Sequence, residues 1–464
     1  MEMNLQAGTI EKPFLKTAIA FRGDIHPFQP FPKASAREAY ETLPAALKNR
    51  LGKMGASRLN YAFPVIRATD YMRFKRDGDR AAFEALYFGK RNALNDLIQA
   101  ECVEHKGRFL DDIINGIYSI CEESAWQLPA HNSYIRDTPQ LILPDVTRPV
   151  MDLFACETGA LLACAAYLLE EEFNAVSPFV LTCIEDNLKR RILLPYLTAH
   201  FWWMGHDDEP MCNWTVWCTQ NVLLTTFLMP WSEKMSSKLA APVRALTGDA
   251  PLFLPENTSD TVVTLQAILY KAAESCDYFL KDYGNDGCCE EGAQYYRHAG
   301  LCLYGAMTVL NTVTGGHFSS LFQWDKVKNI AAYILNVHVD DKYYFNFADC
   351  SPIAGRAGVR EYLFGKVTGQ EDLCLFAAKD FQAGQGQLIT DEVNGGNLFY
   401  RMQTVFYYEE LMHRDTSATL PHRDVYYPSV GLFLVHSNTM DLAVKDGDKA
   451  DSHKNKRRIQ RAQP

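Results

Sequence analysis

The densest cluster of chemically versatile side chains is the segment 286–298, which reads DGCCEEGAQYYRH. Tyr295 and His298 are three residues apart, so on a helix they share one face, and Arg297 lies beside them. A free phenol has a pKa of about 10, so a tyrosine base needs nearby positive charge, which Arg297 and His298 could supply. The segment therefore has the parts of an acid–base site. An ordinary helix start, with acidic residues in its first turn and tyrosines packed inward, is the alternative interpretation.

A second cluster is the segment 213–221, which reads NWTVWCTQN. Asn213, Trp217 and Asn221 recur every four residues, which places two amides around an indole on one helix face. Amide and aromatic groups together suit a sugar, because hydroxyls need fixed hydrogen-bond partners and the apolar face of a sugar stacks on rings. A buried helix whose amides are satisfied internally explains the pattern equally well.

Isolated polar residues elsewhere are weaker candidates. His131 and Asn132 follow Pro129 in a predicted turn, where a histidine is most often simply solvated. A glycoside hydrolase would need a pair of carboxylates across a cleft. The carboxylates that could serve in such a pair are Asp207, Asp208, Glu157 and Glu291.

Most of the chain has the apolar spacing of helices, and these helices would position the clusters. The strongest begins after Asp152, which is placed to cap it, and another ends just before Gly284, where a left-handed cap is expected. Further helices are predicted over 81–100, 178–197, 213–228, 262–279, 295–309 and 325–335. Long helices with short connections predict stacked antiparallel pairs, in a solenoid or a closed toroid. After about residue 415, segments 425–436 and 440–444 predict a pair of strands.

Composition places the chain among ordinary globular proteins. Of its 464 residues, 47% are hydrophobic and 22% are charged, and 46 basic against 56 acidic residues give a net charge of −10. This balance argues against a surface that coats nucleic acid or an anionic membrane. We expect a cytoplasmic protein, because the N-terminal residues are not those of a signal peptide and no apolar stretch is long enough to span a membrane. The thirteen scattered cysteines predict reduced core thiols and argue against a structural zinc site.

Motifs for several other reaction classes are missing from the sequence. It contains no phosphate loop, no GxGxxG after a strand, no HExxH and no GxSxG elbow. Phosphoryl transfer, dinucleotide redox chemistry and serine hydrolysis therefore have no sequence support.

Three segments resemble the heparinase II/III-like polysaccharide lyases. Segment 286–300, DGCCEEGAQYYRHAG, is similar to their DGG-x-x-EGPxYW motif, and 212–221, CNWTVWCTQN, is similar to their NNWNPWxxSN helix. Segment 442–454, LAVKDGDKADSHK, is similar to their GDNADSHNHND strand. The resemblance implies a mainly α protein: an incomplete (α/α) toroid of antiparallel helix pairs over 1–414, followed by the start of an antiparallel β-sandwich over 415–464. It also implies β-elimination of a uronate-containing polysaccharide.

The resemblance also implies roles for individual residues. Tyr295 matches the tyrosine that acts as acid and base, Asn213 the residue that neutralises the substrate carboxylate, and His453 a catalytic partner. His131 lies in a segment similar to the rim of the active site. The residues expected to contact substrate are Trp214, Trp217, Asn221, Glu291, Tyr296, Arg297, His298 and Asn132. Since the substrate is a polyanion, a basic cleft is expected, formed by residues such as Arg297, Arg356 and Arg360.

The C-terminal residues depart from the family pattern. After His453 the family continues with a further histidine and an aspartate, whereas segment 454–464 reads KNKRRIQRAQP. We interpret this as a truncated or frameshifted β-domain, which would also remove the place where family members bind a structural metal, so no cofactor is expected in this chain. The expected partner is an acidic oligo- or polysaccharide, with neither nucleic acid nor membrane, and a homodimer is allowed. The alternative functions are an (α/α)-barrel hydrolase of uronides and a non-catalytic carbohydrate-binding remnant.

Overall fold

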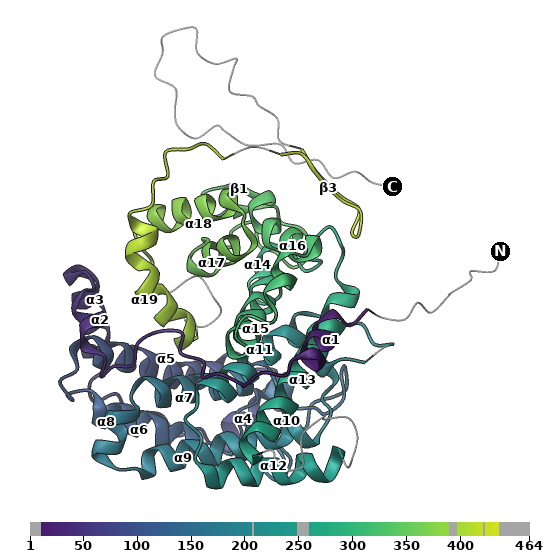
Figure 1. The fold of residues 1–464 in the computed structure, drawn as a ribbon. Helices are drawn as coiled ribbons and strands as arrows, with labels where there is room; N and C mark the ends of the chain where they lie inside the picture. Colours follow the sequence, from purple (N-terminus) through teal and green to yellow (C-terminus); the bar gives the residue numbers. More distant parts are fainter. Residues whose placement is uncertain (1–10, 207, 248–258, 389–396, 421–422, 436–464) are drawn as a thin grey trace. The chain divides into compact units, whose positions relative to one another are not determined.

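The computed structural model describes residues 11–206, 208–247, 259–388, 397–420 and 423–435. It divides into two compact units whose segments alternate along the chain. The first unit comprises Met1–Asp282, Cys302–Ser319 and Glu392–Glu409, and the second comprises Tyr283–Leu301, Ser320–Asp391 and Glu410–Pro464. Both are built mainly from α-helices, which confirms the predicted class (Figure 1).

The first unit contains the longest helices. In chain order its α-helices are α1 (Pro13–Ala20), α2 (Arg37–Glu41), α3 (Ala45–Ala56), α4 (Ala68–Asp77), α5 (Ala81–Glu104), α6 (Leu110–Cys121), α7 (Leu153–Leu168), α8 (Glu170–Val176), α9 (Phe179–Leu188), α10 (Leu194–Thr198), α11 (Asn213–Leu228), α12 (Glu233–Thr247) and α13 (Asp260–Asp282). Most of α15 (Gly300–Val313) and of α19 (Leu398–Met412) also belongs to it. Short 3-10 turns are η1 (Pro129–His131) and η3 (Trp202–Met204).

Helices α7 and α11 form the centre of the first unit. They pack against each other, and α11 also packs against α13. Almost every residue of α7 is buried, with Glu157 as the partly exposed exception. A helix that is apolar on all sides must be surrounded by others, which is why this pair occupies the core. As predicted, the Asp152 carboxylate caps α7 by accepting a hydrogen bond from the Ala155 amide at 2.7 Å.

The single helix predicted over 178–197 is divided by a wider turn. α9 is followed by the π-helical segment η2 (Lys189–Leu193) and then by α10, which has a proline in its first turn. Pro195 has no amide hydrogen, and its ring would clash with the carbonyl of Arg191 in a regular α-helix. The π-helical turn relieves that clash, so the chain continues in a helical form past the proline.

The start of α1 depends on a buried carboxylate from α13. The amides of Phe14 and Leu15 donate to the two oxygens of Asp277 at 3.0 and 2.8 Å. Burial raises the pKa of Asp277 to about 7, although both amide bonds and Lys12 oppose the shift. The folded protein therefore holds a proton on Asp277 more tightly than the unfolded chain does.

This shift makes the stability of the first unit depend on pH. Because the folded pKa is raised, the contribution of Asp277 to the free energy of unfolding is fully present below its unfolded pKa of about 4. It is lost as the pH rises towards 7. Relative to Asp277→Asn, which cannot titrate, the wild-type protein should have a melting temperature that falls between about pH 4 and about pH 7. Thermal denaturation across this range measures the difference. The exposed Asp111, changed to Asn, is the control, and a difference independent of pH would contradict the assignment.

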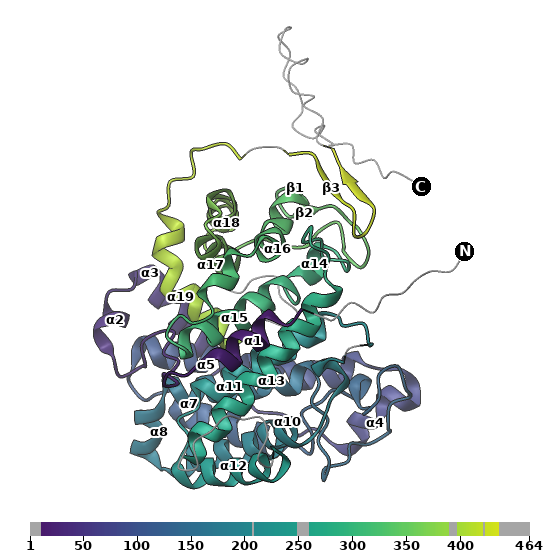
Figure 2. The same ribbon diagram turned by 45° about the vertical axis from the view of Figure 1, so that its right-hand side comes forward.

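The second unit combines short helices with two strand pairs. Its elements are α14 (Ala293–Tyr296), most of the 3-10 segment η4 (Ser319–Gln323), α16 (Asp325–Asn336), β1 (His338–Asp340), β2 (Tyr343–Tyr344), α17 (Val359–Thr368), α18 (Glu371–Ala383), β3 (Val425–Tyr427) and β4 (Leu432–Leu434). Both strand pairs are antiparallel. Figure 2 shows α16, α17 and α18 grouped near β1 and β2, and the ring of His338 in β1 lies 4.8 Å from that of Phe376 in α18.

Two predictions about the segment after α13 are wrong. Gly284 is not in the left-handed conformation; it is needed instead because a Cβ there would lie 2.5 Å from the side chain of Ser429. The helix predicted over 295–309 is interrupted, since a tight turn separates α14 from α15. In this turn the Ala299 amide donates to the carbonyls of both Tyr295 and Tyr296.

The strand pair predicted near the C-terminus lies earlier than expected. The chain reverses between Tyr427 and Leu432, so β3 and β4 both fall inside the segment predicted as one strand. The second predicted strand, 440–444, lies outside the described residues, as does most of the predicted β-domain. The boundary at residues 414 and 415 stays a prediction.

Two further sequence predictions can be compared with the structure. All thirteen cysteines are free thiols, as predicted. Within the described ranges, no single helix has both the length and the apolar character needed to cross a membrane. The helix pair α7 and α8, which is bent by 78°, meets the criteria for a membrane span by length and composition alone.

Candidate functional site

A histidine–carboxylate pair connects η1 with the start of α7. The Nδ1 of His131 and the Oδ2 of Asp152 are 2.8 Å apart, and Asp152 is fully buried. Asp152 Oδ2 also accepts from the Leu128 amide at 3.1 Å, while its Oδ1 caps α7. Since a carboxylate only accepts hydrogen bonds, Nδ1 donates the proton in this bond. One carboxylate thus both starts a helix and orients an imidazole.

His131 lines a cleft of about 250 Å³ in the first unit, which we call the aromatic cleft. Its ring centroid lies 4.8 Å from that of Trp214 in α11, and Trp214 lies 5.1 Å from Trp202 in η3. The Arg136 guanidinium stacks 4.7 Å from the centre of the Trp202 ring. Other lining residues include Tyr134, Cys212, Phe201 and Gln140.

The aromatic cleft offers three kinds of interaction to a ligand. The indoles of Trp202 and Trp214 present flat apolar faces, and both side chains are half-buried, so part of each remains accessible. Arg136 supplies a permanent positive charge, although Asp137 and Glu209 lie 3.6 and 3.9 Å from its nitrogens. His131 supplies a group that can accept or donate a proton. This set suits a ring with an apolar face and an acidic substituent.

The amide residues predicted to bind substrate are used in packing. Asn221 is fully buried; it donates to the Trp217 carbonyl at 3.0 Å and accepts from Asn397 at 2.9 Å. Asn132 is also fully buried and holds the turn after η1 by donating to the Leu141 carbonyl at 3.0 Å. These bonds agree with the alternative interpretation of a buried helix with satisfied amides.

The remaining residues of the second cluster differ in accessibility. Asn213 is the first residue of α11 and is buried, directly beside the half-buried Trp214 of the aromatic cleft. The Trp217 indole is buried and donates to the Glu157 carboxylate at 2.7 Å, which ties α11 to α7. The structure therefore brings His131 and Trp214 together, with Asn213 adjacent in sequence.

The two adjacent tyrosines of the second unit have different environments. Tyr295 is half-buried, and its ring centroid lies 6.3 Å from that of His298. Tyr296 is fully buried and donates to the Ala331 carbonyl at 3.2 Å. Burial raises the pKa of Tyr296 far above its ordinary value, so this phenol stays protonated. Only Tyr295 of the two presents a surface that a substrate can reach.

The cations near Tyr295 are held within the second unit. Arg297 is buried; it donates to the carbonyls of Ala354 and Arg356 and lies 3.7 Å from Glu361. Burial, followed by the charges of Arg360 and Arg297, lowers the pKa of His298 to about 3, so this imidazole is neutral and supplies no positive charge. Glu291, on the same segment, is half-buried.

Two further arginines of the expected basic cleft also have partners in the second unit. Arg356 is paired with Asp380 at 2.6 Å and with Asp341. Arg360 is buried and donates to the Arg297 carbonyl at 3.0 Å. The Arg356 pairs connect the segment before α17 to α18 and to Asp341, and the Arg360 bond connects α17 to the segment after α14.

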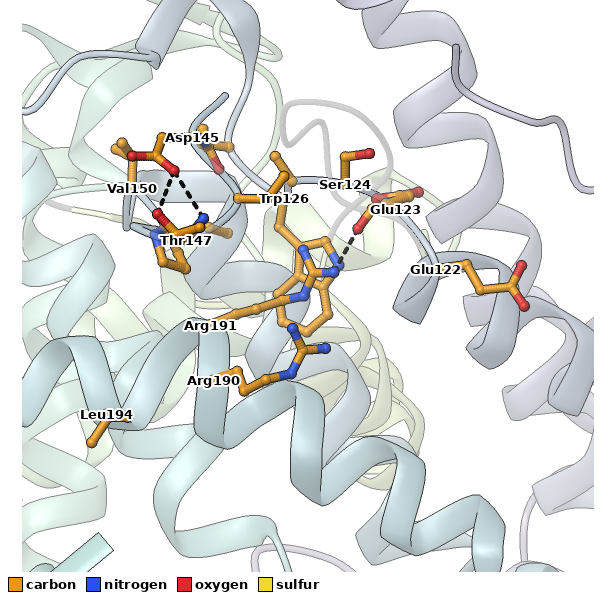
Figure 3. A pocket seen from close by; sticks show the side chains of 15 residues that line it. Glu122, Glu123, Ser124, Trp126, Asp145, Thr147, Val150, Arg190, Arg191 and Leu194 are labelled. Atoms are coloured by element: carbon orange, nitrogen blue, oxygen red, sulfur yellow. Dashed lines mark hydrogen bonds between the residues drawn. The ribbon is translucent and has the colours of Figure 1, made fainter. Parts of the chain in front are cut away.

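A larger cavity of about 510 Å³ lies elsewhere in the first unit (Figure 3). Arg191 stacks 4.8 Å from the Trp126 ring and donates to the Glu123 carbonyl at 2.5 Å. The Glu123 side chain is neutralised by Lys90 and Arg91, both at 2.8 Å. The Glu123 carboxylate at this cavity is thus already paired, with two cations that lie outside the lining.

Sequence reasoning missed several residues of the aromatic cleft. Asp152 was identified only as a helix cap, while Arg136 and Trp202 lie in irregular segments with no periodic signal. The Trp202–Trp203 pair before the second cluster was the available clue. His453 and Asp207 lie outside the described residues, and no group of three or more metal-ligating side chains occurs among the residues placed.

No protein-family model and no curated protein sequence matches the chain.

Proposed function

We propose that the chain is a polysaccharide lyase that cleaves uronate-containing glycans by β-elimination. The observation that carries the proposal is the His131–Asp152 pair, at 2.8 Å, in a cleft that also contains Trp202, Trp214 and Arg136. This cleft includes the first helical turn of the segment that resembles the sugar-binding helix of heparinase II/III-like lyases. An aromatic wall, a cation and an acid–base group are the parts that an acidic sugar requires.

We also propose the architecture that the resemblance implies, an (α/α) toroid followed by the start of a β-sandwich. The packing of α7 against α11, and of α11 against α13, supports an (α/α) toroid in the first unit. The β3–β4 hairpin supports the start of a β-sandwich beyond residue 414.

In the proposed reaction, a base removes the proton at C5 of the uronate, next to its carboxylate. That proton is acidic enough only if the carboxylate is neutralised, which we assign to Arg136 together with Asn213. Arg136 is assigned this role because its guanidinium stacks on Trp202 in the aromatic cleft, where it also donates to the Pro210 carbonyl at 2.5 Å. Elimination then expels the O4 substituent and leaves a double bond between C4 and C5, with no water consumed.

Tyr295 is the proposed proton acceptor, and His131 is proposed to assist proton transfer to the leaving oxygen. The role of Tyr295 rests on the sequence resemblance, and its half-buried ring in the second unit supports it. The fully buried Tyr296 is unsuited to the same role. His453 remains part of the proposal as a third catalytic residue.

The products test the proposal directly. The full chain is incubated with oligosaccharides of different uronates, and ultraviolet absorbance and product masses are followed. Elimination gives an absorbing unsaturated uronate and fragments whose masses sum to that of the substrate. Fragments whose masses sum to that of the substrate plus one water, without new absorbance, would identify a hydrolase instead. Binding by calorimetry without any product would identify a carbohydrate-binding protein, and either result would overturn the lyase assignment.

A further inference from the structure

Two consecutive arginines border the cavity of about 510 Å³ in the first unit, which we call the larger cavity (Figure 3). Arg190 and Arg191 lie in the π-helical turn η2, a kind of turn that occurs frequently at functional sites. Both donate to the same side-chain oxygen of the buried Asn187, Arg190 from Nη2 at 3.0 Å and Arg191 from Nε at 3.1 Å. One neutral oxygen therefore holds two positive charges side by side at the wall of the cavity.

The Arg191 guanidinium is fixed from two further directions. It stacks 4.8 Å from the centre of the Trp126 ring. Its Nη2 also donates to the carbonyls of Cys121 and Glu123, at 3.2 and 2.5 Å. A guanidinium held in this way loses little conformational entropy when a ligand binds to it, which favours affinity.

Nearby carboxylates offset the charge of the two arginines only weakly. Arg190 Nε bonds Asp186 at 2.9 Å, but both side chains are 51% exposed, and water screens such a pair. The carboxylate of Glu123 is paired with Lys90 and Arg91 at 2.8 Å, on the side away from the lining. The two consecutive arginines therefore keep a net positive charge.

Both guanidinium groups still have donors for a ligand. Among the residues that the structure describes, Nη1 of Arg190 and Nη1 of Arg191 have no hydrogen-bond partner. Paired N–H donors match the two oxygens of a carboxylate, and hydrogen bonds between two charged groups are the strong ones. Glu122 also lines the cavity, but Figure 3 shows its side chain directed away from the two arginines.

Other lining residues can bind hydroxyl groups. The Asp145 carboxylate is exposed and accepts the amide and the hydroxyl of Thr147 at 2.9 and 2.7 Å. Figure 3 shows Asp145 and Thr147 apart from the two arginines. Ser124 adds an exposed hydroxyl. The larger cavity thus offers cationic donors in one place and acceptors for hydroxyls in another, which suits a sugar that carries a carboxylate.

The larger cavity is a neighbour of the aromatic cleft. Val150 lines both of them. Each contains an arginine stacked on an indole, Arg136 at 4.7 Å from the Trp202 ring and Arg191 at 4.8 Å from the Trp126 ring. Carboxylates recur along a uronate-containing glycan, so two adjacent sites with the same cationic arrangement match successive acidic residues of one chain.

We propose that the larger cavity is a second binding site for a uronate residue of the glycan. The carboxylate of this residue accepts hydrogen bonds from Nη1 of Arg190 and Arg191, and its hydroxyls bond the Asp145 carboxylate. The choice of ligand rests on the proposed function, while the site itself takes no part in bond cleavage. A glycan bound in the aromatic cleft then places a residue that is not cleaved in the larger cavity.

The test is hydrogen–deuterium exchange of the full chain with D-glucuronate, which has no substituent on O4 and therefore binds without elimination. Peptides over 122–127 and 189–194 report on the larger cavity, and those over 131–136 and 212–214 report on the aromatic cleft. Glucuronate should slow exchange at the larger cavity, whereas equal concentrations of glucose or inorganic phosphate should not. No protection there, or equal protection by glucose or phosphate, would overturn the proposal.

The same experiment separates this inference from the lyase assignment. Protection confined to 131–136 and 212–214 would overturn the second site and leave the proposed reaction in place. Protection at 122–127 by glucuronate, in a chain that forms no unsaturated product from oligosaccharides, would support the second site although the lyase assignment had failed.

Arg190→Gln removes one of the two cations. The glucuronate concentration that gives half of the protection at 122–127 should rise about tenfold, the scale of one hydrogen bond to a charged group. Arg108→Gln is the control, because Arg108 is also bonded to a carboxylate four positions earlier, that of Glu104, but lines neither cavity. Circular dichroism establishes that each variant is folded. An unchanged concentration for folded Arg190→Gln would overturn the proposal.

Discussion

Replacing Tyr295 with phenylalanine is expected to lower the rate of unsaturated uronate formation by at least about a hundredfold, the usual scale of a lost acid–base group. The variant keeps the half-buried aromatic ring and removes only the hydroxyl that would accept the C5 proton. Because the ring is retained, KM should change little and the effect should appear in kcat. The initial rate of ultraviolet absorbance increase, measured at saturating oligosaccharide, gives the ratio.

Tyr296 provides the matched control for this substitution. It is the next residue, but it is fully buried and donates to the Ala331 carbonyl at 3.2 Å. Tyr296→Phe should therefore lower the stability of the second unit by about 1 kcal/mol and leave kcat nearly unchanged. The reverse outcome, with Tyr296→Phe inactive and Tyr295→Phe active, would assign the role of proton acceptor to Tyr296 instead.

The second large effect is expected from His131→Ala. Removal of a positioned proton-transfer group costs about 10² to 10⁴ in rate, and the loss should fall mainly on kcat/KM if His131 also contacts the sugar. His131 is the better position for this test than its partner, because Asp152 also accepts the amides of Leu128 and Ala155 and its loss would disturb α7. Product formation by the variant and its melting temperature are measured together.

His206 is the control for this substitution. It is an exposed histidine in the segment before α11, so His206→Ala should retain the wild-type rate. His131→Gln is a second variant that keeps a polar side chain near Asp152 without an imidazole, and it should be as inactive as His131→Ala. A folded His131→Ala protein with unchanged rate would show that the aromatic cleft does not carry the reaction.

Local patterns were sufficient to predict several of the long helices, among them α5, α7, α11 and α13. The helix over 213–228 has the bounds of α11, and Asp152 caps α7 as its position suggested. These successes share a cause, since helix periodicity and capping depend on residues within a few positions of each other. Where a distant residue intervenes, the prediction was wrong: Gly284 is placed by its close approach to Ser429. The helix over 295–309 is instead broken by a local tight turn, which the apolar spacing did not reveal.

The sequence by itself determined that the chain is mainly helical and that its polar and aromatic residues gather in two segments. Only the tertiary structure decided which of those residues are accessible. Asn221 and Tyr296 share the residue types expected of a sugar site, yet both are fully buried, while Trp214 and Tyr295 remain half-buried. His131 gains its significance from Asp152, twenty-one positions away. Burial and pairing of this kind depend on contacts between segments far apart in the chain, which no local pattern records.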